Sequence, residues 1–342
     1  MGHSGPSTAV PVVLLYNLDP SWSPADRQEI EAEVERLCEA LAAAGCDSGP
    51  KCLPTPDVAA ALADGDPGEC VIFNWCDALP GVPRSEAEVA RELESLGFTF
   101  TGSPFQVLEL SWRKEAVKAR LAAAGVPTPA WTVVRAGDVD GWRHFPAIVK
   151  AAHEHASLGL GRDSVVMGRE ELAERVAHVV ETLHQPALVE DFIDGREFHV
   201  TVWGNGSLAT LPPAEMDFAA VADPRERLCG YDAKFTPGSP AYEAIQLVLP
   251  APLSAGERAE LERVATAAYR AVGCRDYARI DLRLRDGVFY VLDVNPNCDL
   301  STETSTAFAA ALAEGSFGRF LARLVELAQR RHPRWGGRVR RV

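Results

Sequence analysis

Two neighbouring segments near the C-terminus alternate between polar and apolar residues, and they read Ala278-Arg279-Ile280-Asp281-Leu282-Arg283-Leu284 and Val288-Phe289-Tyr290-Val291-Leu292-Asp293-Val294-Asn295. Successive side chains of a β-strand point to opposite faces of its sheet. Arg279, Asp281 and Arg283 therefore share one face of the first strand. The same rule puts Asp293 and Asn295 on one face of the second strand. We expect an antiparallel hairpin with a polar face and an apolar face.

The turn between these strands determines whether their polar faces coincide. A turn of two residues would put Asp293 opposite Ile280. A loop of three residues, 285–287, would put Asp293 opposite Arg279, with Asp281 on the diagonal. We predict the three-residue loop, with its glycine in a left-handed conformation, because it gathers the polar side chains.

The oxygen atoms of Asp281, Asp293 and Asn295 would then lie together on adjacent strands. Carboxylate and amide oxygens are hard ligands that suit Mg²⁺, which completes its coordination with water and phosphate oxygens. The alternative interpretation is a solvated strand face with a surface Arg–Asp pair, since exposed ion pairs are common.

Strands and helices alternate in the N-terminal part of the chain. Residues 9–16 and 70–75 form apolar runs typical of buried strands. Ser23-Pro24 is typical of a helix start, and Ser85 with Glu88 predicts a capping box at a second helix. This alternation indicates a parallel, doubly wound domain over roughly residues 9–104.

The middle of the chain combines a helix near residues 111–124 with crowded strand signals. A second helix is expected at 169–184, and strands are expected at 147–150, 164–167, 187–193 and 197–203. We interpret this region as a small α+β unit.

The last part has a capped helix that begins at Ser254, with Glu257 at the box position, and further helices up to about residue 331. The basic run Arg330–Arg341 is expected to be a solvated tail. The fold class is therefore α/β and α+β. The expected divisions are residues 1–111, 112–200, 201–331 and a basic tail at 332–342.

Composition excludes several classes of function. The 342 residues carry a net charge of −14 and no basic stripe before the last dozen residues, so nucleic acid is not an expected partner. No apolar run reaches the roughly 18 residues of a membrane helix, and the N-terminus lacks a signal-peptide pattern. The eight cysteines form no CxxC pair. We expect a cytoplasmic protein with reduced thiols and no membrane partner.

Motif searches leave two further candidate regions. The chain has no Gly-Lys dipeptide, no GxGxxG after a strand, no GxSxG and no HExxH. Lys150 ends an apolar strand and precedes the loop 154–161, whose backbone amides could hold an oxyanion. Glu190 and Glu197 lie on two strands joined by a turn. Each region by itself also fits an ordinary turn.

Taken in order, these segments resemble the ATP-grasp superfamily, and most closely its D-alanine–D-alanine ligase branch. The resemblance covers roughly residues 85–330 and rests on motifs at 100–103, 113–114, 148–150, 189–190, 196–198, 231–235, 278–281 and 292–296. Three of the chain's five lysines fall at positions that meet nucleotide phosphates in that family. The resemblance implies an ATP-grasp fold, in which two α+β subdomains enclose the nucleotide behind an N-terminal Rossmann-like domain.

The resemblance also implies a role for individual residues around ATP. Lys114 and Lys150 would contact the α- and β-phosphates, and Lys234 would reach the γ-phosphate. Glu190 and the backbone of 192–193 would frame the adenine, and Glu197 would accept hydrogen bonds from the ribose. The backbone and side chains assigned to nucleotide binding are those of Lys114, Lys150, Glu154, Gly159, Glu190, Phe192, Ile193, Glu197 and Lys234.

The catalytic and metal-binding positions follow in the same way. Arg279 would stabilise the transferring phosphoryl group, Lys234 would assist it, and Ser157 lies in the loop that would close over the phosphates. Asp281, Asp293 and Asn295 would hold one or two Mg²⁺ ions, and Mn²⁺ is a substitute that the same ligands could accept.

Departures from the family pattern fall in the expected substrate pockets. Ala156 and Phe235 replace a family serine and tyrosine, and Asp299 aligns with a family glycine. Thr304 could replace a serine that holds the acceptor carboxylate, and His155 is a further substrate candidate. The family's acidic residue that holds the amine of the first substrate has no clear match in this chain, and Asp19 is the candidate for it.

The resemblance therefore implies an ATP-dependent carboxylate–amine ligase that works through an acylphosphate on small-molecule substrates, with an amino acid among them and D-Ala–D-Ala not the product. One alternative is the same activation with another nucleophile, by cyclisation or transfer to a carrier protein. Another is a non-catalytic nucleotide-binding module. The related ligases are commonly dimers, which implies a homodimer here.

Overall fold

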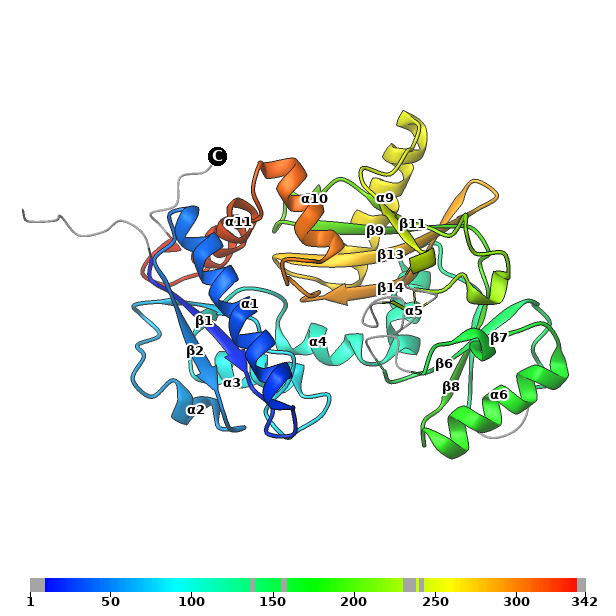
Figure 1. Ribbon diagram of the computed structural model, residues 1–342, viewed down its shortest axis with the longest axis horizontal. Coiled ribbons are helices and arrows are strands. Elements are labelled where there is room, and N and C mark those ends of the chain that lie inside the picture. The colour runs from blue at the N-terminus through cyan, green and yellow to red at the C-terminus, as the bar shows by residue number, and fades with distance from the viewer. Residues whose placement is uncertain (1–9, 136–138, 155–158, 230–237, 240–242, 337–342) are drawn as a thin grey trace, which may run out of the picture.

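The computed structural model describes residues 10–135, 139–154, 159–229, 238–239 and 243–336. Figure 1 shows three regions side by side: a blue and cyan N-terminal domain, a central sheet labelled by β9, β13 and β14, and a smaller green unit that carries α6. Within the described ranges, no helix has the length and apolar character needed to cross a bilayer.

The N-terminal domain contains a parallel sheet with the strand order β2-β1-β3-β4. Its strands are β1 (Val12–Asn17), β2 (Ser48–Leu53), β3 (Val71–Asn74) and β4 (Thr99–Phe100). Its helices are α1 (Pro24–Ala43), α2 (Val58–Ala61) and α3 (Glu86–Ser95). The predicted parallel arrangement is confirmed. Because β2 and β3 flank β1, the chain reverses its direction of winding between β1 and β3, where α/β sheets commonly bind ligands.

The two predicted caps of this domain have different outcomes. Ser23 caps α1 and forms a capping box with Asp26, so the predicted start is correct. The capping box at Ser85 is wrong, because its hydroxyl donates to the Val82 carbonyl and accepts from the Leu79 amide. Ser85 therefore closes the preceding turn.

The small unit is an antiparallel sheet with the order β5-β8-β6-β7, against which α6 (Arg169–Thr182) packs. Its strands are β5 (Trp131–Val134), β6 (Ala147–Ala151), β7 (Val165–Val166) and β8 (Ala187–Asp191). The 3₁₀ helix η1 (Arg162–Ser164) precedes β7. The helix and strands predicted for this region are present, with ends shifted by a few residues.

The central sheet has the order β12-β11-β9-β13-β14, with β10 paired to β9. Its strands are β9 (Arg196–Trp203), β10 (Ala209–Thr210), β11 (Ala214–Asp217), β12 (Gln246–Val248), β13 (Tyr277–Arg285) and β14 (Val288–Pro296). Helix α9 (Ala255–Val272) covers its apolar face and begins with the predicted Ser254–Glu257 capping box. The 3₁₀ helix η2 (Pro224–Glu226) lies between β11 and β12.

Two segments that we placed in the small unit belong to the central core instead. Strand β9 pairs with β13 over its whole length. The predicted helix at 111–124 is two helices, α4 (Phe105–Ser111) and α5 (Lys114–Ala123). Val117 and Leu121 of α5 pack in the core formed with α9 and β13. Burial of apolar side chains determines which sheet a strand or helix packs with, and the periodicity of a single segment does not specify that partner.

The β13–β14 hairpin differs from the predicted one in its turn. Arg285 pairs with Val288, so the turn has two residues, and Asp286 and Gly287 have φ values of 52° and 77°. Both central residues of a type I′ turn require positive φ, and Asp-Gly suits it. A bulge after Asp281 then shifts the register, so that Asp281 lies directly opposite Asp293. The predicted gathering of carboxylates is present, and it depends on the bulge.

The C-terminal helices α10 (Ser305–Glu314) and α11 (Phe317–Gln329) follow the hairpin. Helix α11 packs against α1 of the N-terminal domain, as Figure 1 shows at the blue and red ends of the chain. The expected solvated tail is wrong for its first residues, because His332 and Trp335 are buried. None of the eight cysteines forms a disulfide, as expected.

Candidate functional site

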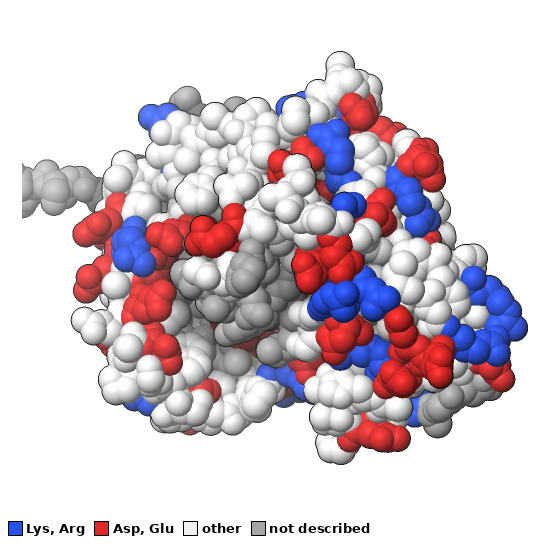
Figure 2. Space-filling view, turned by 45° about the vertical axis from the view of Figure 1, so that its right-hand side comes forward, with Lys and Arg blue, Asp and Glu red and all other residues white. Residues whose placement is uncertain are grey.

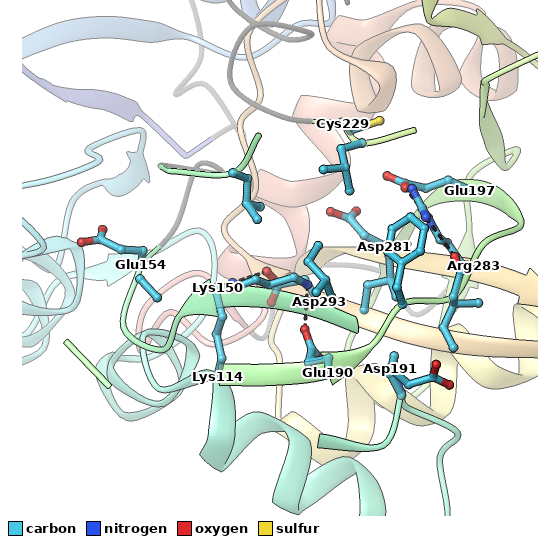
Figure 3. Close-up of a pocket in the computed structure, with 18 residues that line it drawn as sticks. Lys114, Lys150, Glu154, Glu190, Asp191, Glu197, Cys229, Asp281, Arg283 and Asp293 are labelled. Carbon is cyan, nitrogen blue, oxygen red and sulfur yellow. Dashed lines mark hydrogen bonds and ion pairs between the residues drawn. The ribbon is translucent and has the colours of Figure 1, made fainter. Parts of the chain in front are cut away.

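A pocket lies between the small unit and the central sheet and encloses about 850 Å³, counting its open mouth. Many of the predicted binding residues line it together, namely Lys114, Lys150, Glu154, Glu190, Phe192, Ile193, Glu197, Asp281 and Asp293. Figure 3 shows these side chains converging from both walls. Apolar and charged side chains line it together, as is usual in small-molecule sites.

Glu190 is buried at the floor of the pocket between two lysines. The Lys150 ammonium lies 2.7 Å from Glu190 Oε2, and Lys118 contacts Oε1. Burial alone would raise the pKa of Glu190, but the two lysine charges outweigh it and hold the pKa below its usual value. The carboxylate is therefore ionised and fixes both lysines.

Lys118 was not among the predicted site residues. It lies one helical turn after Lys114 on α5, and its ammonium donates to Thr128 Oγ1 at 2.9 Å. The i, i+4 spacing of the two lysines was the available signal, because such residues share one face of a helix.

The metal-binding candidates lie where β13 and β14 pair. Like charges opposite each other on neighbouring strands are destabilising. Arg279 offsets the negative charge of Asp281, with Nε–Oδ1 and Nη2–Oδ2 distances of 2.7 and 3.0 Å. Lys114 offsets the charge of Asp293, with an Nζ–Oδ2 distance of 2.5 Å. Asn295 donates to Asp281 Oδ2 at 3.1 Å.

This set of oxygen donors fits a hard divalent cation. Asp281 and Asp293 present carboxylates on paired strands, and Asn295 adds an amide beside them. Each carboxylate is already balanced by a side-chain cation, so the negative charge of the cluster is accommodated without a metal. Both carboxylates line the pocket and so could meet a ligand there.

Glu197 is held by Arg283 at the other end of the pocket, with an Nε–Oε2 distance of 2.8 Å. Arg283 also donates to the Ile193 carbonyl at 2.9 Å and lies over the Phe192 ring. Burial would raise the pKa of Glu197, but the charge of Arg283 and its hydrogen bond hold that pKa well below its usual value. Glu197 is therefore an ionised hydrogen-bond acceptor.

Sequence reasoning placed Arg283 on the correct strand face but gave it no role. Its partners come from β9 and from the turn before it, so only the pairing of β9 with β13 identifies it. His199 was missed for the same reason. It lies directly opposite Asp281 on β9.

Other predicted residues serve as local structural contacts. Glu154 lines the pocket but is bonded to Arg84 of the N-terminal domain and to Gln185. Gly159 has a φ of 71°, which favours glycine, and its carbonyl accepts from Arg175.

Three substrate candidates lie outside the pocket lining. Asp19 accepts from the Gly81 amide at 2.7 Å, and Asp299 accepts from Ser301. Thr304 caps α10 and donates to the Ser301 carbonyl. Ser157, His155 and Lys234 lie outside the described residues.

Acidic residues from two domains lie near Arg279: Asp299 follows β14, and Asp77 and Glu86 belong to the N-terminal domain. Sequence reasoning did not single out Asp77 or Glu86. Asp77 is exposed at the surface, yet desolvation by the surrounding protein atoms, together with the charge of Asp299, raises its pKa to about 6. Burial and the charge of Asp77 also raise the pKa of Glu86, although a hydrogen bond from Asn297 opposes this. Figure 2 shows groups of acidic side chains on both the left and the right of the face that it displays. A cation bound here would relieve the repulsion.

Replacing Asp77 by asparagine tests this electrostatic cost. A carboxyl with a raised pKa penalises the folded state once it must ionise. The Asp77→Asn protein should therefore melt at a higher temperature than the wild type at pH 8. The difference should shrink below pH 6 and vanish below about pH 4, where the unfolded carboxyl is also protonated.

Thermal melts between pH 4 and pH 8 measure this difference. Asp64→Asn is the matched control, because Lys51 lowers the pKa of Asp64 and the sign is reversed. An Asp77→Asn protein that is less stable than the wild type at pH 8 would contradict the assignment.

The chain is similar to known proteins of one family. Residues 121–326 match the family model described as the D-ala D-ala ligase C-terminus. An uncharacterized protein, y4sG, of Sinorhizobium fredii is 34% identical over 77% of this chain and 75% of its own length. A D-alanine–D-alanine ligase of Desulforudis audaxviator is 32% identical over 74% of this chain and 80% of its own length.

Solved structures agree with the fold. A D-alanine–D-alanine ligase from Bacillus anthracis, solved in complex with ATP, superposes with a TM-score of 0.72 at 20% identity, and covers 94% of this chain and 98% of that one. The expected ATP-grasp fold is thereby confirmed. With the family model and the sequence relatives, it establishes that the chain belongs to the D-alanine–D-alanine ligase family of ATP-grasp, ADP-forming carbon–nitrogen ligases.

Proposed function

We propose that this ligase activates a small-molecule carboxylate as an acylphosphate and transfers the acyl group to an amine, with an amino acid as one substrate and a product other than D-Ala–D-Ala. The observation that carries the proposal is the convergence of Lys114, Lys150, Glu197, Asp281 and Asp293 on one pocket. Activation is needed because a carboxylate is a poor electrophile. Positioning and charge neutralisation then supply most of the catalysis.

The nucleotide would lie along the pocket. The adenine would be framed by Glu190 and the backbone of 192–193, and Glu197 would accept from the ribose hydroxyls. Lys150 would meet a phosphate beside its present Glu190 contact. Lys114 would exchange its Asp293 contact for a phosphate oxygen when that carboxylate ligates a metal.

Asp281, Asp293 and Asn295 would hold Mg²⁺, with Mn²⁺ as a substitute, and the ion would neutralise phosphate charge when bound. Arg279 would hold its guanidinium against the transferring phosphoryl group and the tetrahedral intermediate, since Asp281 orients it. Lys234 and Ser157 are proposed to act on the phosphates from the segments outside the described residues.

The substrate proposal rests on the acidic region formed by Asp77, Glu86 and Asp299. The raised pKa values of Asp77 and Glu86 reflect in part the repulsion between neighbouring carboxylates. A bound cation would relieve that repulsion, and the ammonium group of an amino acid is such a cation. Asp299 also stands where the resemblance places a glycine near the acceptor. These features support a remodelled amino-acid pocket. A homodimer and a cytoplasmic location stay predictions.

Product analysis tests the proposal. The protein is mixed with ATP, Mg²⁺ and pooled L- and D-amino acids and amines, and ADP, AMP and phosphate are quantified. We expect ADP and phosphate only with particular pools, together with a new amide mass. AMP and pyrophosphate would contradict the acylphosphate route. Loss of water from a single substrate would indicate cyclisation, and ATP binding without turnover in any pool would favour a non-catalytic module.

A further inference from the structure

Three side chains of different chemistry meet at the Glu197 end of the pocket. Glu197, His199 and Cys229 each place one donor atom, an oxygen, a nitrogen and a sulfur, within 4.8 Å of the other two. Glu197 and His199 share a face of β9 because one residue separates them, and Cys229 follows η2. Figure 3 shows Cys229 and Glu197 on the same side of the pocket, beside Asp281.

His199 is oriented as metal-binding histidines are. Its Nδ1 lies 3.3 Å from the Ser305 hydroxyl, which fixes the ring. Its Nε2 is buried and has no hydrogen-bond partner among the described residues, and the side chain is only 5% exposed. A buried, unpaired ring nitrogen is costly unless a ligand occupies it. An imidazole that is held through one nitrogen commonly offers the other to a metal.

Glu197 has the complementary arrangement. Arg283 occupies its Oε2 at 2.8 Å, while Oε1 lies 3.8 Å from His199 Nε2. The Asp281 Oδ1 atom is also 3.9 Å from that nitrogen. The free imidazole nitrogen therefore faces two carboxylates and a thiol.

We propose that Glu197, His199 and Cys229 bind a borderline-soft transition-metal dication such as Zn²⁺, with water as the fourth ligand. Nitrogen, sulfur and oxygen donors together suit Zn²⁺, whereas Mg²⁺ selects oxygen donors alone. The site is thus distinct from the Asp281–Asp293–Asn295 cluster. Zn²⁺ holds its tetrahedral ligands roughly 3.3–3.8 Å apart, so the three side chains must close by about 1 Å.

Occupation of this site would inhibit nucleotide binding. The ion would take the carboxylate that we assign to the ribose, so the two ligands compete for Glu197. This consequence rests on the proposed function, whereas the metal site itself does not. A thiophilic cation would therefore act as a competitive inhibitor.

Cobalt provides a direct test, because Co²⁺ occupies zinc sites and a thiolate ligand gives it a charge-transfer absorption band. The nucleotide-free protein is titrated with Co²⁺. We expect the band in the wild type and in Cys46→Ser, a matched control on a half-buried cysteine elsewhere. Cys229→Ser should lack the band and bind Co²⁺ at least about 100-fold more weakly, since even outer contacts of a metal site are worth 10–100-fold.

A wild-type protein without the band, or a Cys229→Ser protein that retains it, would overturn the proposal. Circular dichroism and a thermal melt of Cys229→Ser establish that the variant folds. Binding at the Asp281 cluster would produce no thiolate band, so the two sites are distinguished.

Adenosine then tests the competition, because it carries the ribose without a phosphate chain that chelates the ion. We expect adenosine to remove the cobalt band. If calorimetry shows that adenosine binds and the band persists, the competition is wrong although the metal site stands. If adenosine does not bind, the assignment of Glu197 to the ribose fails. The cobalt–thiolate band then still tests the metal site, because that test does not depend on the nucleotide.

Discussion

Replacing Arg279 by alanine should lower the rate of ADP release at least about 100-fold, the loss typical when a key donor to a developing oxyanion is removed. Arg279 lies on the polar face of β13, and Asp281 fixes its guanidinium through two hydrogen bonds of 2.7 and 3.0 Å. The charge of Asp281 outweighs burial and raises the pKa of Arg279, so it is a permanent cation. A fixed cation stabilises the transition state without reorganisation.

The measurement is steady-state ADP release with a substrate pool that supports turnover. Arg279→Lys keeps the charge but loses the planar fork, and should recover only part of the rate. Arg258→Ala is the matched control, because Arg258 lies on the exposed side of α9 and should leave turnover unchanged. Near-normal turnover of Arg279→Ala would refute the role assigned to Arg279.

Replacing Asp276 by asparagine should lower the free energy of unfolding by about 3 kcal/mol, the lower end of the cost of breaking a buried ion pair, because the Arg331 left behind is partly exposed. Asp276 is completely buried. Its carboxylate lies 2.5 and 2.8 Å from the two terminal nitrogens of Arg331. It also accepts from the Gly102 amide at 2.8 Å and from Asn205 at 2.7 Å.

Asparagine isolates the effect of the charge, because Asp276 has a φ of 65° and asparagine tolerates this conformation. Urea unfolding measures the loss. Asp64→Asn is the control, since the Lys51–Asp64 pair is exposed and should contribute little. A loss below about 1 kcal/mol for Asp276→Asn would mean that Arg331 finds other partners or water.

Arg279 can be recognised from a local pattern, whereas Asp276 can be recognised only from its tertiary contacts. Arg279 and the carboxylates beside it were predicted from a strand pattern, and their roles came from the resemblance. Asp276 was not singled out, because its partners lie in three distant parts of the chain. Its importance is a property of tertiary packing.

The hairpin shows how far local pattern extends. Alternation correctly predicted both strands and the polar side of each. The turn was predicted with three residues and has two, and the bulge after Asp281 supplies the shift that brings Asp281 and Asp293 together. A bulge depends on how both strands pack against β9 and α9, which no local pattern encodes.

The site shows the same division. Lys114, Lys150, Glu190 and Glu197 could be chosen from the sequence because they stand at strand ends or in motifs with a family spacing. Arg283 and His199 could not, because they act through side chains on other elements. Lys118 had only its i, i+4 spacing to Lys114 as a signal, and its contact with Glu190 shows why it matters. Their burial became evident only with their partners in place.

By itself, the sequence determined most of the helices and strands and the parallel N-terminal sheet. Together with the family resemblance, it also indicated most of the carboxylates and lysines that line the pocket. Backbone preferences, caps and side-chain periods act over a few residues, so they can be inferred locally. Tertiary structure alone decided that β9 joins β13, that α11 packs against α1, and that Asp281 faces Asp293. Strand partners and register depend on the free energy gained when segments far apart in the chain are buried together. Those contacts exist only once the chain has folded.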